Sequence, residues 1–72
     1  MNMKNLKPGR EHADPETPGL HFAVAMDGVT TFICRYTDGE YDYGEILGHL
    51  GEMSVQSARA HVRRLSTSFC PI

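Results

Sequence analysis

The sequence predicts a small α+β domain: a β-hairpin, or three antiparallel strands, followed by two short helices that pack on one face of the sheet. Three observations predict this fold class. Apolar residues alternate along residues 20–26, β-branched and aromatic residues dominate residues 29–37, and the apolar spacing becomes helical from residue 46 onward. The chain of 72 residues has room for one domain. A domain of this size buries only around 60% of the surface that its unfolded chain exposes.

Residues 1–19 are predicted to form a flexible N-terminal arm, which leaves residues 20–72 as a single small α+β domain. The arm contains three prolines, two glycines and almost no apolar residue. Such a composition cannot bury enough apolar surface to offset the entropy that is lost when the chain becomes ordered. The last two residues of the arm, Pro18 and Gly19, fit the centre of a type II turn that leads into the first strand.

The first two strands are predicted to form a tight hairpin. Asp27 and Gly28 are a pair that favours a two-residue hairpin turn. Residues 29–37 (VTTFICRYT) are rich in the residue types that strands prefer. Cys34 in this second strand is predicted to be a small core hydrophobe. The alternating apolar residues of the first strand are Leu20, Phe22, Val24 and Met26.

The period changes after a second turn signal at residues 37–39. Residues 40–43 (EYDY) can extend briefly as a third strand. Asp42 and Glu45 have the spacing of a capping box, which predicts the start of a first helix. Gly51 is predicted to stop this helix, in the position that glycine favours after a helix C-terminus. The apolar residues of the first helix are Ile46, Leu47, Leu50 and Met53.

A second helix is predicted to begin after Ser54, whose side chain can cap it. Arg59 and Arg63 are four residues apart and share a face of this helix, with His61 and Arg64 beside them. This arginine face is separate from the apolar stripe that would pack on the sheet. The stripe consists of Val55, Ala58, Val62 and Leu65.

The net charge of −2 identifies no class of partner, but the charges are unevenly distributed along the chain. Residues 20–53 carry one arginine and six carboxylates, whereas residues 54–72 carry three arginines and no carboxylate. Two cysteines are too few for the disulfide framework of a small secreted domain. The sequence shows neither a secretory signal nor a run of about 20 apolar residues. We therefore expect a cytoplasmic protein without a membrane partner.

Residues 38–45 (DGEYDYGE) place four carboxylates and two tyrosines in a short stretch. A calcium loop of the EF-hand type requires a glycine at position six and a glutamate at position twelve. Counted from Asp38, those positions are Tyr43 and His49, so the loop pattern fails. Two interpretations remain: a solvated edge, or a surface that binds another protein with the tyrosines as anchors. The candidate protein-binding residues are Asp38, Glu40, Tyr41, Asp42, Tyr43 and Glu45.

No pattern in the chain indicates catalysis, so we expect no enzyme, no metal site and no cofactor. Structural zinc sites use ligand pairs that are two to four residues apart, and the four histidines do not have this spacing. A nucleophilic Cys34 would need to be accessible and activated, which its predicted core position opposes. The glycines are scattered and form no phosphate-binding loop.

Residues 46–65 (ILGHLGEMSVQSARAHVRRL) resemble the helix-turn-helix segment of bacterial DNA-binding regulators. The shared features are a short apolar helix, a glycine, a serine cap and a helix that carries arginines. The resemblance implies that Gln56, Ser57 and Arg59 face base edges. It also implies that Arg63 and Arg64 contact phosphates. The segment departs from the pattern in the glycines of its first helix and in the absence of a helix in front of it.

The function expected from the sequence is that of a small non-catalytic module that binds a protein, as a regulator or inhibitor of the phage or mobile-element type. The acidic stretch and the arginine face are its two candidate surfaces. The alternative is a DNA-binding transcriptional regulator that uses residues 46–65. In a plainer interpretation the arginines only solvate the helix and pair with Glu45 or Glu52. A homodimer is a further expectation, because a small sheet leaves an edge exposed and large apolar residues are few.

Overall fold

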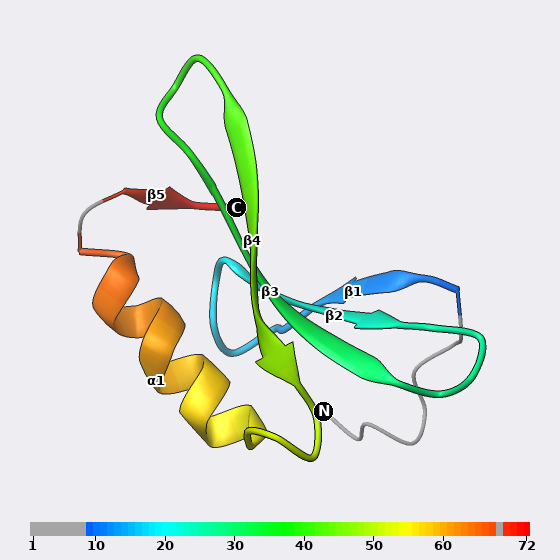
Figure 1. Ribbon diagram of the computed structural model, residues 1–72. Helices are drawn as coiled ribbons and strands as arrows, with labels where there is room; N and C mark the ends of the chain where they lie inside the picture. Colours follow the sequence, from blue (N-terminus) through cyan, green and yellow to red (C-terminus); the bar gives the residue numbers. More distant parts are fainter. Residues whose placement is uncertain (1–8, 68) are drawn as a thin grey trace.

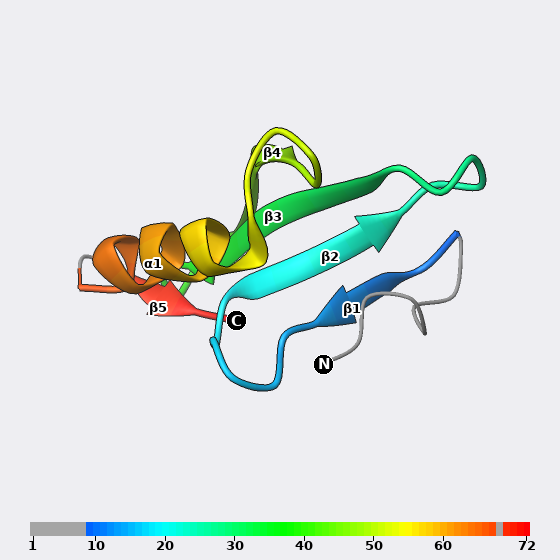
Figure 2. The same cartoon turned by 90° about the horizontal axis from the view of Figure 1, so that it is seen from below.

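An antiparallel sheet carries an α-helix on one of its faces (Figure 1). The computed structural model describes residues 9–67 and 69–72. The strands pair in the order β1-β2-β3-β4, and β5 pairs with β3 beyond the start of β2. Figure 2 shows β1, β2 and β3 side by side. The elements are β1 (Glu11–Ala13), β2 (Leu20–Val24), β3 (Thr30–Thr37), β4 (Asp42–His49), α1 (Val55–Leu65) and β5 (Cys70–Pro71).

The predicted first hairpin is confirmed as β2 and β3, which pair from Leu20 opposite Cys34 to Val24 opposite Thr30. Its loop differs from the two-residue turn that we predicted. The backbone N–H of Ala25 donates to the Val29 carbonyl and that of Gly28 to the Ala25 carbonyl, each at 2.9 Å. Three residues therefore form the loop, and Gly28 takes the positive φ of 90° that such a loop requires at its last position.

The predicted fold class is wrong in its second half, because residues 46–49 belong to strand β4 and not to a first helix. β4 pairs along its length with β3, and the register shifts where Ile46 lies opposite Ile33 and Gly48 lies opposite Phe32. Leu47, between them, is the extra residue of a bulge and turns toward the core. The bulge interrupts the alternation of side chains along the strand. The apolar residues on either side of it therefore have a spacing like that of a helix. The glycines of β4 also weaken a helix by up to about 1 kcal/mol each relative to alanine.

The predicted second helix is confirmed as α1, the one helix of the described residues. Ser54 is its N-cap, and the Ser54 hydroxyl accepts a hydrogen bond of 3.0 Å from the backbone N–H of Ser57. Gly51 does not stop a helix. It lies with a φ of 106° in the turn between β4 and α1, where Glu52 and Met53 donate to the His49 carbonyl. In the described part of the chain no helix is long and apolar enough to cross a membrane.

The core lies between the sheet and α1. The rings of Phe22 and Phe32 meet edge to face, with centroids 5.6 Å apart. Cys34 is fully buried, as predicted. The helix contributes the two central residues of its apolar stripe, and the other two are half-buried beside them. The buried cluster consists of Leu20, Phe22, Phe32, Cys34, Ala58 and Val62.

Residues 9–19, which we expected to belong to the flexible arm, instead join the sheet and are partly buried. β1 pairs with β2, and Asp14 and Thr17 are buried. The turn predicted at Pro18 and Gly19 is confirmed, because Leu20 donates to the Thr17 carbonyl at 3.1 Å and Gly19 has a φ of 94°. Residues 1–8 of the predicted arm lie outside the described residues. Composition alone could not show that a polar segment is held by hydrogen bonds and an ion pair.

Candidate functional site

The loop between β3 and β4 is organised by the side chain of Asp38. Its Oδ1 atom accepts hydrogen bonds from the backbone N–H groups of Glu40 (2.9 Å) and Tyr41 (2.8 Å). Its Oδ2 atom accepts one from the hydroxyl of Tyr43 at 2.8 Å. These donors, with the Tyr41 and Glu40 amides contributing most, hold the pKa of Asp38 below its ordinary value. The carboxylate of Asp38 therefore already has its hydrogen-bond partners within the loop.

Thr37 completes the same loop from the other side. Its hydroxyl accepts a hydrogen bond from the backbone N–H of Gly39 and donates one to the carbonyl of Tyr41, each at 3.0 Å. Gly39 has a φ of 96°, which a side chain would disfavour. Two polar side chains and one glycine thus give an exposed loop a defined shape.

Tyr43 anchors the base of the loop to the body of the domain. Its ring stacks on Tyr36 with centroids 5.2 Å apart, and Tyr36 stacks on Phe69 at 4.0 Å. The hydrogen bond to Asp38 raises the pKa of the Tyr43 hydroxyl above its ordinary value. Tyr43 is therefore engaged on its face and at its hydroxyl, and it is less available than the sequence suggested.

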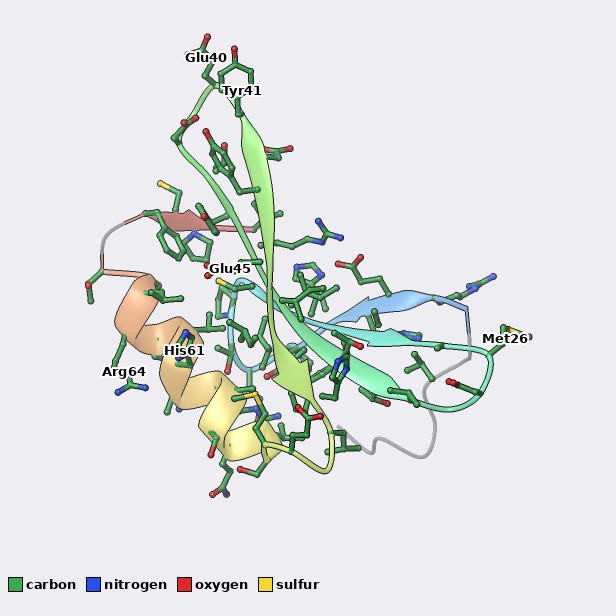
Figure 3. All side chains as sticks on the ribbon, viewed as in Figure 1. Met26, Glu40, Tyr41, Glu45, His61 and Arg64 are labelled. Carbon is green, nitrogen blue, oxygen red and sulfur yellow. The ribbon has the colours of Figure 1, made fainter. Side chains whose placement is uncertain are left out.

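Glu40 and Tyr41 form the tip of the hairpin and point away from the rest of the molecule (Figure 3). The side chains of the two residues are exposed, and Tyr41 is 61% exposed. Figure 1 shows the hairpin projecting beyond the sheet and the helix. Whether these residues bind a protein stays a prediction, but their side chains take no part in the hydrogen bonds that hold the loop together.

The outer edge of β4 is the second feature of this surface. β4 pairs with β3 on one side, and no described strand pairs with it on the other. Residues 41–46 are all exposed, and residues 47–49 are half-buried. We call residues 38–46 the acidic hairpin. It carries four carboxylates, and residues 36–48 contain no lysine, arginine or histidine.

Exposed apolar side chains are concentrated on the same element. Seven large hydrophobic side chains are exposed in the described part of the chain, and four of them lie on β4 or directly beside it. Ile46 is the most exposed of the four, at 68%. The four residues are Tyr41, Tyr43, Ile46 and Leu50. Tyr43 and Ile46 point to opposite faces of the sheet, so these side chains line the edge of the strand and do not form one patch.

The side chains of β4 divide between the two faces of the sheet. Tyr43 and Glu45 lie opposite Tyr36 and Cys34, on the side of α1. Burial raises the pKa of the Cys34 thiol, and the nearby Glu45 carboxylate raises it further. Asp42 lies opposite Thr37 on the other face, which no helix of the described residues covers and which we call the uncovered face. The four carboxylates of the acidic hairpin are thus distributed over a loop and both faces of the sheet.

The predicted arginine face is divided by an ion pair that the sequence did not reveal. The Nε atom of Arg59 lies 2.8 Å from Oδ2 of Asp14, and its Nη1 atom lies 2.6 Å from Oε2 of Glu16. Burial works to raise the pKa of Asp14, but the hydrogen bonds from Arg59 and from the Glu16 backbone outweigh it and lower the pKa. Arg59 thus holds the N-terminal segment to α1.

The other residues of that predicted face have different surroundings. Ser57 takes part in the helix cap, through its backbone and through a 3.0 Å hydrogen bond between its hydroxyl and that of Ser54. Gln56, Arg63 and Arg64 are exposed. Arg64 points away from the sheet in Figure 3. Two arginines near the end of α1 therefore remain available, and they do not pair with the acids that we had considered.

The uncovered face of the sheet holds a cluster of charged side chains that sequence reasoning missed. Arg35 pairs with Glu11, and Nδ1 of His21 lies 3.2 Å from Oε1 of Glu11. Nε2 of His21 lies 3.0 Å from the Ile72 carbonyl oxygen. The Arg35 side chain lies so close to Gly44 that a Cβ atom there would lie 2.8 Å from Nη1. These contacts depend on strand register, which no single-sequence pattern specifies.

The described part of the chain contains no pocket and no group of three metal-ligating side chains. The absence of catalysis, metal and cofactor stays a prediction. No protein-family model matches the chain, and comparisons with curated proteins and with solved structures find no match.

Proposed function

We propose that this protein is a small non-catalytic module that binds another protein, as a regulator or inhibitor, through the acidic hairpin. The observation that carries the proposal is the free edge of β4, on which exposed apolar side chains and carboxylates are combined. Interfaces are enriched in tyrosine and in exposed apolar side chains that become buried on binding. The ordered loop supports the proposal further, because a surface that is already in shape loses less entropy on binding.

A photo-crosslinking experiment tests this proposal. A photoreactive phenylalanine analogue replaces Tyr41 at the tip of the acidic hairpin, and the protein is irradiated inside bacterial cells that produce it. The matched control carries the analogue at Met26, which is 82% exposed in the loop of the other hairpin. We expect a discrete adduct from position 41 that is absent from position 26. Equal labelling of many proteins from both positions would contradict the proposal.

The alternative function, DNA binding through α1, has one supporting observation. Arg63 and Arg64 are exposed in the last turn of the helix, and α1 contains no carboxylate. The helix that would precede α1 in a helix-turn-helix segment is absent, and Arg59 is paired with two acids. DNA binding would thus depend on two phosphate contacts, and binding through so few contacts releases few counterions.

Fluorescence anisotropy of a labelled DNA duplex, measured at low salt and near physiological salt, tests the DNA-binding alternative. Binding tighter than roughly 10⁻⁵ M that weakens as the salt concentration rises would favour it. The variant in which Arg63 and Arg64 are both alanine should then lose the binding. No binding at low salt would leave the acidic hairpin as the working surface.

A further inference from the structure

We propose that the free edge of β4, at residues 42–46, accepts an extended basic segment of the partner protein as an additional antiparallel strand. This inference rests on the proposed function and specifies the chemistry of the partner. It combines three observations: an unpaired strand edge, the apolar side chains along that edge, and a hairpin without a single cationic residue.

The backbone of β4 provides the first part of the binding energy. An edge strand presents a row of N–H and C=O groups that an incoming extended chain can pair with. The other edge of the main sheet is β1, which is only three residues long. In β4 the exposed stretch has five residues before the bulge at Leu47 and the half-buried end of the strand. Five residues are the usual length of a strand.

The side chains of β4 determine which residues an added strand would carry. A residue directly opposite Asp42 would lie on the uncovered face, and one opposite Glu45 would lie on the side of α1. Positions opposite Tyr43 and Ile46 would meet exposed apolar surface. An antiparallel partner strand should therefore carry, from its N-terminus to its C-terminus, an apolar residue, a basic residue, any residue, an apolar residue and a basic residue. The middle position faces Gly44, beside which the Arg35 guanidinium lies, so a third cation is disfavoured there.

Charge decides between a basic partner and a second copy of this chain. Residues 38–52 carry five carboxylates and no lysine or arginine. Two copies paired through β4 would bring these two sets of carboxylates together, and like charges across a strand pair are destabilising. The one cation beside the edge, Arg35, is already paired with Glu11. A basic strand removes the repulsion and pairs with Asp42 and Glu45.

Binding of a synthetic peptide tests the inference. The probe is the fluorescently labelled nonapeptide Thr-Thr-Val-Lys-Thr-Val-Lys-Thr-Thr, titrated with the full chain at low ionic strength. A counterpart has glutamate in place of both lysines, and a second counterpart carries N-methyl groups on alternate residues. N-methylation keeps the side chains but removes backbone donors. We expect the lysine peptide to bind and each counterpart to bind at least tenfold more weakly.

Protein variants locate the binding site. Replacing Asp42 by Asn together with Glu45 by Gln should weaken binding of the lysine peptide about two- to thirtyfold, since an exposed ion pair contributes about 0.2–1 kcal/mol. Ile46→Lys should abolish binding, because it replaces an apolar contact at the end of the exposed edge with a charge of the same sign as the lysines of the peptide. Met26→Lys makes the same change on the other hairpin and should leave binding intact. Amide spectra of all variants check that the fold is retained.

The outcomes separate this inference from the proposed function. Equal binding of the N-methylated peptide, or unchanged binding by Ile46→Lys, would overturn strand addition. A chain that forms dimers in sedimentation and becomes monomeric on Ile46→Lys would also overturn it, since the occupant of the edge would then be a second copy. If the peptide fails while the crosslink from position 41 persists, the protein-binding function stands and strand addition alone is wrong. Failure of both experiments would contradict strand addition and the protein-binding function alike.

Discussion

The hydroxyl of Tyr43 donates a 2.8 Å hydrogen bond to the carboxylate of Asp38, across the mouth of the β3–β4 loop. The same carboxylate accepts two backbone N–H groups, so one side chain closes the loop and ties it to the stacked rings of Tyr43 and Tyr36. Two of the six residues that the sequence offered as protein-binding candidates therefore form the scaffold of the tip. The exposed neighbours Glu40 and Tyr41 are presented by that scaffold.

Replacing Asp38 by alanine should loosen the tip without unfolding the domain. Its three hydrogen bonds are lost, and the amides of Glu40 and Tyr41 should exchange with solvent faster while the amides of β2 and β3 keep their protection. Native-state hydrogen exchange measures both. Asp42→Ala is the matched control, since it removes an exposed carboxylate of the same hairpin. Equal effects of the two changes would mean that Asp38 does not organise the loop.

Removing Asp14 should destabilise the whole domain. Asp14→Ala loses the hydrogen bonds to Arg59 and to the Glu16 backbone, and a hydrogen bond to a charged group contributes about 1.5–3 kcal/mol. Urea denaturation should show a free energy of unfolding that is lower by roughly this amount. Arg63→Ala, at an exposed position of the same helix, should change it by less than about 0.5 kcal/mol. Comparable losses would show that the ion pair is not structural.

The same pair predicts how stability depends on pH. The pKa of Asp14 is lower in the folded protein than its ordinary value. A lowered pKa in the folded state means that the carboxylate stabilises the fold at neutral pH, and that this contribution is lost as pH falls through the folded pKa. The melting temperature should therefore fall as the pH is lowered below about 4. The drop should be smaller in Asp14→Asn, which has no carboxyl group at this position to titrate.

Two glycines with positive φ should respond differently to alanine. At Gly28, with a φ of 90°, an added Cβ atom would meet nothing within 4 Å, so Gly28→Ala should cost only the backbone strain of about 1–2 kcal/mol. At Gly19, with a φ of 94°, the Cβ atom would lie 2.8 Å from Pro71 and 3.2 Å from the Arg35 carbonyl oxygen. Gly19→Ala should therefore cost more and should expose β5. Equal melting temperatures for the two variants would contradict this packing of β5 against the start of β2.

The two thiols should react at different rates. Cys34 is buried in the core, and its burial together with Glu45 raises the pKa of its thiol, whereas Cys70 is exposed. A thiol reagent at mildly alkaline pH should label one cysteine quickly, and Cys70→Ser should remove that fast phase. Fast labelling that survives in Cys70→Ser would mean that the core around Cys34 opens readily.

Local patterns in the sequence predicted the elements whose signal is local. The hairpin of β2 and β3, the Ser54 cap and the apolar stripe of α1 depend on residues that are close together in the chain. The prediction failed where a tertiary contact determines the local structure. The bulge at Leu47 made a strand resemble a helix, and Arg59 pairs with Asp14 across 45 residues of sequence.

The candidate site was predictable only as a region of the chain. Its charges and tyrosines are visible in the sequence, but their division into scaffold and exposed tip depends on the β3–β4 register. Asp38 and Tyr43 belong to the scaffold, and Tyr41 belongs to the tip. The free edge of β4 could not be predicted either, because it follows from the strand order of the sheet.

The acidic hairpin, and not the pair of arginines at the end of α1, is the surface that we propose contacts the partner. The most direct test places a photoreactive residue at Ile46 on β4 in one variant and at Arg64 on α1 in another, and compares the crosslinked adducts formed in cells. Both positions are exposed. We expect a discrete protein adduct from position 46 and none from position 64. An adduct from position 64 without one from position 46 would contradict the proposed contact surface.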